Sequence, residues 1–278
     1  MKLSIITINR NNAKGLEKTM QSVAAQTYKE FEYIIIDGAS TDSSVEVIKS
    51  RESEYAHLKW VSEPDKGIYN AMNKGLRMAS GDYIQILNSA DCLASDDVTE
   101  RMLLALEELK APSILYGNMV KCFPDGHQVV DKSFAGQEIT MLGMYKGTLN
   151  HDPTYIRRDL FEKYGFYDEN LKIVSDWKCY LKAFIFGGEK PKYEDLDVTL
   201  FDMTGISENA DSKAMIRKER QTVLEELIPS VYLHDYERYS DDISLMRRVH
   251  RHSVAYNLFW LIERGLFKME KVKKKKRS

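Results

Sequence analysis

Three aspartates in the first third of the chain stand where predicted strands end, and their side chains could bind a cation or a phosphate group. They are Asp37, Asp65 and Asp91, and a glycine follows each of the first two within two residues. A single aspartate in such a place commonly caps a helix or stabilises a turn. Three at one edge of a sheet favour a shared site, because Mg²⁺ and Mn²⁺ prefer oxygen ligands and leave coordination positions open for phosphate.

The elements that must position these aspartates alternate between strand and helix. Apolar runs rich in β-branched residues predict four buried strands, at 3–8, 31–36, 58–61 and 83–87. Apolar residues at helical spacing follow each run, at 16–23, 45–48, 68–78 and 98–109. Four such units predict a doubly wound, mainly parallel sheet, which binds ligands outside the carboxyl ends of its strands. Asp91, at the end of the fourth strand, is therefore the first candidate site residue.

The second half of the chain departs from this pattern. Residues 114–123 and 128–132 flank a Pro-Asp-Gly-His turn, which predicts a hairpin and hence a mixed sheet. Residues 133–150 contain three glycines and little periodicity, and they predict a loop. The remaining elements are predicted as helices at 158–164, 176–186 and 212–227, a strand at 197–201, and helical structure from 232 onward.

The charge balance argues against nucleic acid as a partner. The 278 residues include 40 basic and 42 acidic side chains, and seven of the basic and one of the acidic residues lie at 268–278. Residues 1–267 therefore carry 33 basic and 41 acidic side chains, a net charge of about −8. A nucleic-acid surface needs a basic face on the folded body, whereas this body is acidic and only its tail is basic.

Composition and cysteine usage predict a protein of the reducing cytoplasm. A hydrophobic content of 43% is enough for a packed core. Cys92, Cys122 and Cys179 have neither the spacing of a zinc site nor that of a disulfide framework. The apolar part of the N-terminus is too short and too strand-like for a signal peptide, and no run reaches the roughly 18 apolar residues of a membrane span.

Four short segments match one known family in residue type and in order. They are Ser4–Asn11, Ile36–Asp42, Glu63–Gly75 and Leu87–Asp91. With them the sequence resembles the GT-A glycosyltransferases of family 2, an inverting group that includes makers of bacterial capsule, exopolysaccharide and lipopolysaccharide sugars. The resemblance implies an α/β fold of the GT-A (Rossmann-like) type, with a mixed, mainly parallel sheet flanked by helices and a helical C-terminal extension.

The resemblance also implies a site for a nucleotide-diphosphate sugar, with a UDP-sugar as the favoured donor. The implied binding residues are Thr7, Asn9, Asp37, Asp65, Lys66, Asn88, Ser89, Ala90 and Ser207. Asp37 would accept a hydrogen bond from the base, and Asp91 would bind the Mn²⁺ or Mg²⁺ that holds the diphosphate. Ser89 and Ala90 replace acids that the family's metal motif often has, which leaves Asp91 as its one carboxylate.

A further match places the general base in the second half. His151–Arg158, Gly165–Asp168 and Val174–Trp177 are similar to the family's stretch that ends in its catalytic aspartate, which makes Asp176 the implied base. Such a base must reach the acceptor hydroxyl on the face of the sugar opposite the departing diphosphate. Without the family match, a helix cap is the favoured interpretation of Asp176, and the match reverses that preference.

Two other residues have both a functional and a plain interpretation. His151 either joins the donor or metal site or is a hydrogen-bonded packing residue. Ser207 follows a Thr-Gly-Ile sequence that either binds phosphate through backbone N–H groups or makes a simple turn.

The predicted organisation is a glycosyltransferase domain at 1–228 and a helical extension with a basic tail at 229–278. The domain would have a nucleotide-binding half at 1–110 and an acceptor half at 111–228, with a saccharide or lipid-linked saccharide as acceptor. Aliphatic and aromatic residues at 254–267 precede the basic tail. This extension either adsorbs to the inner face of an anionic membrane, or its helix packs on the body or on another subunit while the basic tail stays in solvent.

Three function classes follow from these observations. The favoured one is an inverting, metal-dependent hexosyltransferase of polysaccharide synthesis. One alternative is a nucleotide-sugar-binding protein with impaired catalysis, because the metal motif has only one carboxylate. Another is a membrane-docking scaffold built on the basic tail. A dinucleotide oxidoreductase is disfavoured, because no Gly-x-Gly-x-x-Gly follows the first strand.

Overall fold

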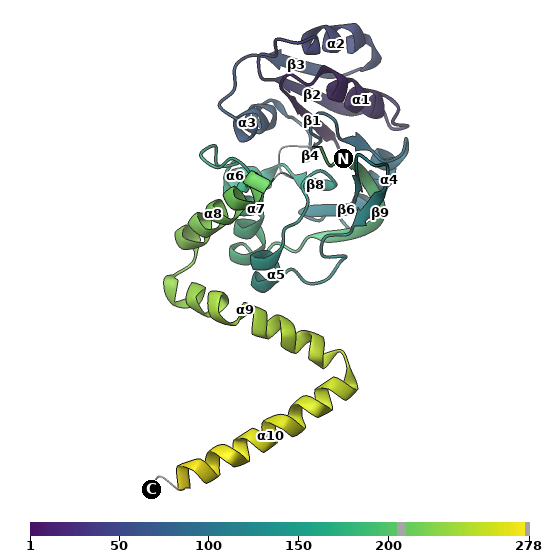
Figure 1. The fold of residues 1–278 in the computed structure, drawn as a ribbon. Coiled ribbons are helices and arrows are strands. Elements are labelled where there is room, and N and C mark those ends of the chain that lie inside the picture. The colour runs from purple at the N-terminus through teal and green to yellow at the C-terminus, as the bar shows by residue number, and fades with distance from the viewer. Residues whose placement is uncertain (205–209, 276–278) are drawn as a thin grey trace. The chain divides into compact units, whose positions relative to one another are not determined.

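The computed structural model describes residues 1–204 and 210–275, and it confirms the predicted mixed α/β fold with a helical C-terminal region (Figure 1). Its described residues form one nine-stranded sheet, with β3-β2-β1-β4-β8-β6-β9-β5 in order and β7 paired to β6. The strands are β1 Leu3–Asn9, β2 Phe31–Asp37, β3 Leu58–Ser62, β4 Tyr83–Ile86, β5 Cys92–Leu93, β6 Ile114–Cys122, β7 Gln128–Asp131, β8 Thr154–Arg157 and β9 Lys192–Asp202.

The first four strands are parallel, as the repeated strand and helix units predict. Every residue of β1, β2 and β4 is buried, because helices cover both faces of this part of the sheet. The register sets Asn9 opposite Asp37, and Asp37 opposite Ser62. Three polar side chains from three strands therefore meet at the carboxyl edge of the sheet.

Helices lie on both faces of the sheet (Figure 1), and successive residues of each strand point to opposite faces. The helices of this half are α1 Ala13–Ala24, α2 Ser44–Arg51, α3 Ile68–Met78 and α4 Val98–Glu108. On one face, residues of α1, α2 and α4 share a core cluster with Ile5 and Tyr33. On the other face α3 approaches β1 so closely that a Cβ on Gly75 would lie 2.4 Å from the Ile6 side chain. Glycine at this position is what lets α3 pack against β1.

The second half mixes strand directions. The predicted hairpin is confirmed, since β7 pairs antiparallel with the end of β6. Strand β8 lies antiparallel between β4 and β6, and β9 pairs parallel with β6. Its helices are α5 Met141–Lys146, α6 Asp159–Tyr164 and α7 Ser175–Leu181, the last continued by a π-helical turn at Lys182–Phe186.

Three short elements differ from the sequence-based prediction. The two-residue strand β5 and the four-residue strand β8 have no alternation long enough to detect, and pairing with longer neighbours stabilises them. Helix α5 lies inside the predicted loop 133–150, where the Thr140 side chain caps it by accepting the Gly143 N–H. Strand β9 begins five residues earlier than predicted, because its first residues pair with β6.

The chain divides into two compact units, Met1–Val223 and Leu224–Ser278. Helix α8 spans Ala210–Leu227, and the second unit further contains α9 Ser230–His250 and α10 Ser253–Lys275. The domain boundary after residue 228 and the two functional halves stay predictions. No helix among the described residues is long and apolar enough to cross a membrane.

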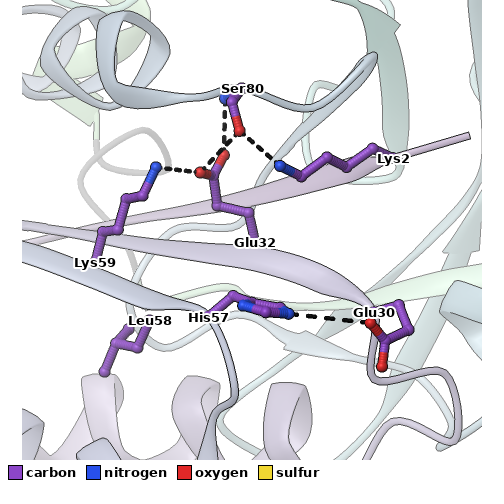
Figure 2. A pocket seen from close by; sticks show the side chains of 7 residues that line it. All are labelled: Lys2, Glu30, Glu32, His57, Leu58, Lys59 and Ser80. Atoms are coloured by element: carbon purple, nitrogen blue, oxygen red, sulfur yellow. Dashed lines mark hydrogen bonds and ion pairs between the residues drawn. The ribbon is translucent and has the colours of Figure 1, made fainter.

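A hydrogen-bonded glutamate holds the amino ends of the parallel strands together (Figure 2). The buried Glu32 carboxylate accepts hydrogen bonds from Ser4 Oγ (2.6 Å), Ser80 N (2.8 Å) and Lys59 Nζ (2.5 Å). Burial by itself would raise the pKa of Glu32, but these hydrogen bonds outweigh it and lower the pKa to about 2. Around it lies a pocket of about 420 Å³, on the edge opposite Asp37, lined by Lys2, Glu30, Glu32, His57, Leu58, Lys59 and Ser80.

The lowered pKa of Glu32 predicts a pH-dependent contribution to stability. Because the folded value lies below the usual 4.5, the contribution is complete above about pH 5 and disappears as the pH falls toward 2. We expect Glu32→Gln to lower the free energy of unfolding by about 2 kcal/mol near neutral pH, and by much less near pH 2.5. Urea unfolding at both pH values measures this. The exposed Glu30→Gln is the matched control, and an equal loss for Glu32→Gln at both pH values would contradict the interpretation.

Candidate active site

The carboxyl end of β4 lies beside the start of β8. This brings together acids that are far apart in the sequence. Asp91 lies in the turn after β4, and His151 and Asp152 lie just before β8. Because β8 runs antiparallel to β4, the start of β8 lies beside the end of β4. The Gln85 side-chain amide of β4 accordingly donates to the backbone oxygen of Asp152 (3.0 Å). Asp176, in the first turn of α7, completes the group.

Contacts with α1 fix the turn that carries Asp91. The Thr19 hydroxyl donates to the backbone oxygen of Asp91 (2.7 Å) and accepts the Ala90 N–H (3.0 Å). Asp91 N–H donates to the backbone oxygen of Asn88 (3.1 Å). Ala90 has a φ of 92°, a strained conformation for a residue other than glycine. The turn is therefore held in one shape by its neighbours, and this shape directs the Asp91 side chain inward, where it is 4% exposed.

Asp91 and Asp152 form a buried pair of carboxyl groups. Burial and the neighbouring Asp152 raise the pKa of Asp91 well above its usual range. Burial likewise raises the pKa of Asp152, although His151 opposes this. Asp202 N–H donates to Asp91 Oδ1 (2.9 Å). Each of the two neighbouring carboxyl groups opposes ionisation of the other, which adds to the effect of burial.

His151 links this pair to Asp176. Its Nε2 lies 3.3 Å from Asp152 Oδ1 and its Nδ1 lies 3.5 Å from Asp176 Oδ2, while the Asn88 amide nitrogen lies 3.0 Å from Nε2. Burial would lower the pKa of His151, but the charges of Asp152 and Asp176 raise it to about 9. In this arrangement the ring is therefore protonated at neutral pH, and its role as a metal ligand stays a prediction.

Asp176 is the ionised acid of the group. Burial would raise its pKa, but the hydrogen bond and charge of His151 outweigh this and lower it. The Tyr69 hydroxyl of α3 donates to Asp176 Oδ1 (3.0 Å), and the side chain remains 15% exposed. Glu219 of α8 accepts the backbone N–H groups of 172–174 just before α7, which fixes the start of that helix. The site thus holds an oriented carboxylate that can accept a proton from a bound hydroxyl.

A buried cation lies close to Asp176. The Arg220 guanidinium packs over the Trp177 ring, 4.8 Å from its centroid, and donates to the Gly147 backbone oxygen (3.1 Å). Its buried Nε has no hydrogen-bond partner. Burial lowers the pKa of Arg220, and the Asp176 charge opposes this.

Sequence reasoning did not single out Asp152, Tyr69 or Arg220 as site residues. Asp152 and Tyr69 lie inside matched segments, and that was a usable signal. Arg220 lies on a helix rich in charged residues, and no sequence signal distinguished it from the others.

The predicted nucleotide-binding residues form a separate group around Asp37. Its buried carboxylate accepts from Asn9 Nδ2 (2.9 Å), Ser40 N (2.9 Å) and Ser62 Oγ (2.6 Å). Burial would raise the pKa of Asp37, but these hydrogen bonds lower it. None of these partners belongs to the Asp91 group, so the structure links Asp91 with Asp176 and gives Asp37 its own network. Thr7 is fully buried and accepts from the Tyr33 hydroxyl (3.1 Å), so its side chain packs in the interior instead of lining an open pocket.

The other predicted binding residues line the same edge. Asp65 packs against Gly38, where a Cβ would lie 2.1 Å from Asp65 Oδ2, and accepts the Gly67 N–H (3.0 Å). Lys66 is exposed, and Ser89 accepts a hydrogen bond from Asn12 (3.4 Å). Ser207 lies outside the described residues.

A divalent cation fits this site only in part. Within the portions of the chain that the structure describes, no three His, Cys, Asp or Glu side chains are arranged to hold a metal ion. Asp91 and Asp152 offer oxygen ligands of the kind that Mn²⁺ and Mg²⁺ prefer, and a bound cation would favour the ionised forms that burial opposes. Two acids do not fill an octahedral shell, so the chemistry derived below does not depend on the ion.

Comparisons with known proteins identify the family of the chain. The model of glycosyl transferase family 2 matches residues 4–168. An uncharacterised glycosyltransferase of Mycobacterium tuberculosis is 31% identical over 221 residues, which cover 77% of this chain and 79% of the relative. A PGL/p-HBAD biosynthesis glycosyltransferase of Mycobacterium bovis is 24% identical over 217 residues, 77% of this chain and 82% of that protein.

A solved structure shares the fold. The crystal structure of S. aureus TarS 1–349 in complex with UDP superimposes with a TM-score of 0.61 at 21% sequence identity, over 73% of this chain and 60% of that one. The match therefore leaves a considerable part of TarS without a counterpart here. The family match covers the strands and the turn that carry Asp37, Asp65 and Asp91. The chain belongs to glycosyl transferase family 2.

Proposed function

We propose that this glycosyltransferase moves a sugar from a nucleotide-diphosphate donor to an acceptor hydroxyl with inversion, and that Asp176 is its general base. The observation that supports this most is the contrast between the acids of the site. Asp91 and Asp152 have raised pKa values, whereas the pKa of Asp176 is lowered and its side chain is partly exposed. An ionised carboxylate that a ligand can reach is what proton abstraction from a sugar hydroxyl requires.

The reaction that follows is a single displacement. The acceptor oxygen attacks the anomeric carbon of the donor sugar while Asp176 takes the hydroxyl proton. The bond from that carbon to the phosphate oxygen breaks on the opposite face, and the nucleoside diphosphate leaves with the electron pair. Tyr69 and His151 orient the Asp176 carboxylate through its two oxygens.

We further propose that Asp91, with Asp152, binds Mn²⁺ or Mg²⁺ when the donor is present. Such an ion would neutralise the departing diphosphate. The raised pKa values of the two carboxyls support this, because a bound cation would favour their ionised forms. Asn9, Asp37, Asp65, Lys66 and the 88–90 turn then form the nucleotide side of the site.

The donor and acceptor are proposed by class. A UDP-sugar is the favoured donor, since TarS, which shares the fold, was solved with UDP. A saccharide or lipid-linked acceptor fits the biosynthetic role in the name of the Mycobacterium bovis relative. A cytoplasmic site of action and a place in polysaccharide synthesis complete the proposal. A binding protein without catalysis remains the alternative, and the absence of turnover with intact nucleotide binding would favour it.

Replacing the proposed base should remove turnover and leave binding intact. We expect Asp176→Asn to lower the transfer rate by at least about a hundredfold, because the amide cannot accept the hydroxyl proton. Donor-dependent release of the nucleoside diphosphate measures the rate, and the thermal shift with UDP should match that of the wild type. Asp159→Asn, an exposed acid paired with Arg157, is the matched control and should keep full activity. Equal rates for Asp176→Asn and the wild type would exclude Asp176 as the base.

The hydrogen bond from α3 should matter for orientation. Tyr69→Phe removes the donor to Asp176 and to the backbone oxygen of Ile173. We expect kcat to fall about tenfold with little change in KM for the donor, and the free energy of unfolding to fall by about 1 kcal/mol. Tyr164→Phe, which loses a comparable hydrogen bond to Glu189, is the control. An unchanged kcat for Tyr69→Phe would show that Asp176 needs no such positioning.

Nucleotide and metal binding can be tested without an acceptor. We expect UDP with Mn²⁺ to raise the melting temperature by about 2–4 °C at saturation, more than GDP, TDP or CDP, because a ligand of the native state stabilises it. EDTA or the Asp91→Asn substitution should remove most of the Mn²⁺-dependent part of the shift. A UDP shift that is identical with EDTA and with Mn²⁺ would argue against a metal ion at Asp91.

A further inference from the structure

The last helix exposes a continuous aliphatic surface. Within α10, Val254, Leu258, Leu261, Ile262 and Leu266 recur at intervals of three and four residues and therefore lie on one side of the helix. Each of these side chains is more than half exposed to solvent. Soluble proteins rarely leave so many neighbouring aliphatic groups in water, and such surfaces usually mark a binding site. We name these five residues the aliphatic face.

Aromatic residues lie on other sides of the same helix. Tyr256 and Trp260 contact each other edge to face, and the Tyr256 ring packs on His250 at the end of α9. Trp260 is 42% exposed. Between 253 and 267 the only charged residues are Glu263 and Arg264. This part of α10 therefore presents mostly apolar and amphipathic side chains, of which tryptophan and tyrosine are suited to the boundary between hydrocarbon and water.

The sequence after the aliphatic face is strongly basic. Residues 268–278 contain seven lysines and arginines and one glutamate, whereas residues 1–267 have an excess of acids. A partner for this helix must therefore offer hydrocarbon and negative charge side by side. The surface of a bilayer with anionic lipids offers both. A second copy of the chain would offer hydrocarbon but would bring the same positive charges, which repel.

We propose that α10 and the basic tail form a docking surface for an anionic lipid bilayer, with the aliphatic face buried among the acyl chains and the basic residues against the lipid phosphates. The helix then lies in the plane of the interface. The inference rests on α10 alone and does not require the proposed chemistry, so the Asp176→Asn protein binds vesicles as the wild type does.

The test is co-sedimentation of the full chain with vesicles. One set contains phosphatidylcholine only, and the other is an equimolar mixture of phosphatidylcholine and phosphatidylglycerol. The wild type is expected to bind the mixed vesicles at least about tenfold more tightly, and added salt is expected to weaken this binding, because screening acts on the charged part of the interaction.

Two variants separate the apolar and the basic contributions. Leu258→Gln with Leu261→Gln is expected to lower partitioning to both kinds of vesicle, at least about tenfold per leucine. Lys273→Gln, Lys274→Gln and Lys275→Gln together are expected to lower binding to the mixed vesicles only, about fivefold per lysine. Leu245→Gln, an exposed leucine of α9, is the matched control and should leave binding unchanged. All of these positions are exposed or lie in the tail, so circular dichroism and urea unfolding should match the wild type.

Two outcomes would overturn the proposal. One is a failure of vesicle binding as proposed: the wild-type chain does not sediment with the mixed vesicles, or the double leucine substitution does not weaken its binding. The other is an oligomer in sedimentation equilibrium that the leucine pair dissociates, without vesicle binding, which would assign the aliphatic face to a second copy of the chain.

Discussion

One imidazolium among three buried carboxyl groups is the interaction on which the active site depends. His151 lies between Asp152 and Asp176, and Asp91 lies against Asp152. A single positive charge cannot compensate three negative charges in a poorly solvated space. The acids therefore differ in pKa: the values of Asp91 and Asp152 are raised, whereas that of Asp176 is lowered and it keeps its charge next to the ring. This difference follows from position, because all three are the same residue type.

The two edges of the parallel sheet use charge in opposite ways. At the amino edge Glu32 receives hydrogen bonds from Lys59, Ser4 and Ser80, so the protein itself compensates the buried charge. At the carboxyl edge the Asp91 group has more acids than cations, and the buried Nε of Arg220 has no partner. A buried charge that the protein's own groups balance stabilises the fold, whereas a buried charge that they do not balance can still bind a ligand of opposite charge. This contrast is why we propose the carboxyl edge as the active site, although the pocket of about 420 Å³ lies at the other edge.

The segments that position Asp176 come from three parts of the chain. Tyr69 of α3 and His151 before β8 bind its two oxygens, and Glu219 of α8 holds the backbone that leads into α7. Substitutions at any of these would act on the base through its orientation. Enzymes are sensitive to such shifts, since small displacements of a catalytic group cost much of the rate.

The sequence alone determined the parallel half of the sheet, the hairpin and the family. These features follow from local patterns: continuous apolar runs, helical spacing, a turn signature and four short motifs in order. The family resemblance predicted Asp91, His151 and Asp176 as site residues, and the structure places His151 next to Asp176.

The tertiary structure decided the rest. The short strand β8 has no detectable pattern, yet its antiparallel pairing with β4 brings Asp152 to Asp91. Packing of α8 on α7 places Arg220 over Trp177, and the pairing of β1, β2 and β3 gives Asp37 a separate hydrogen-bond network. Protonation states and partners depend on distances between residues far apart in the chain. Those distances are set by strand pairing and helix packing, which local sequence does not encode.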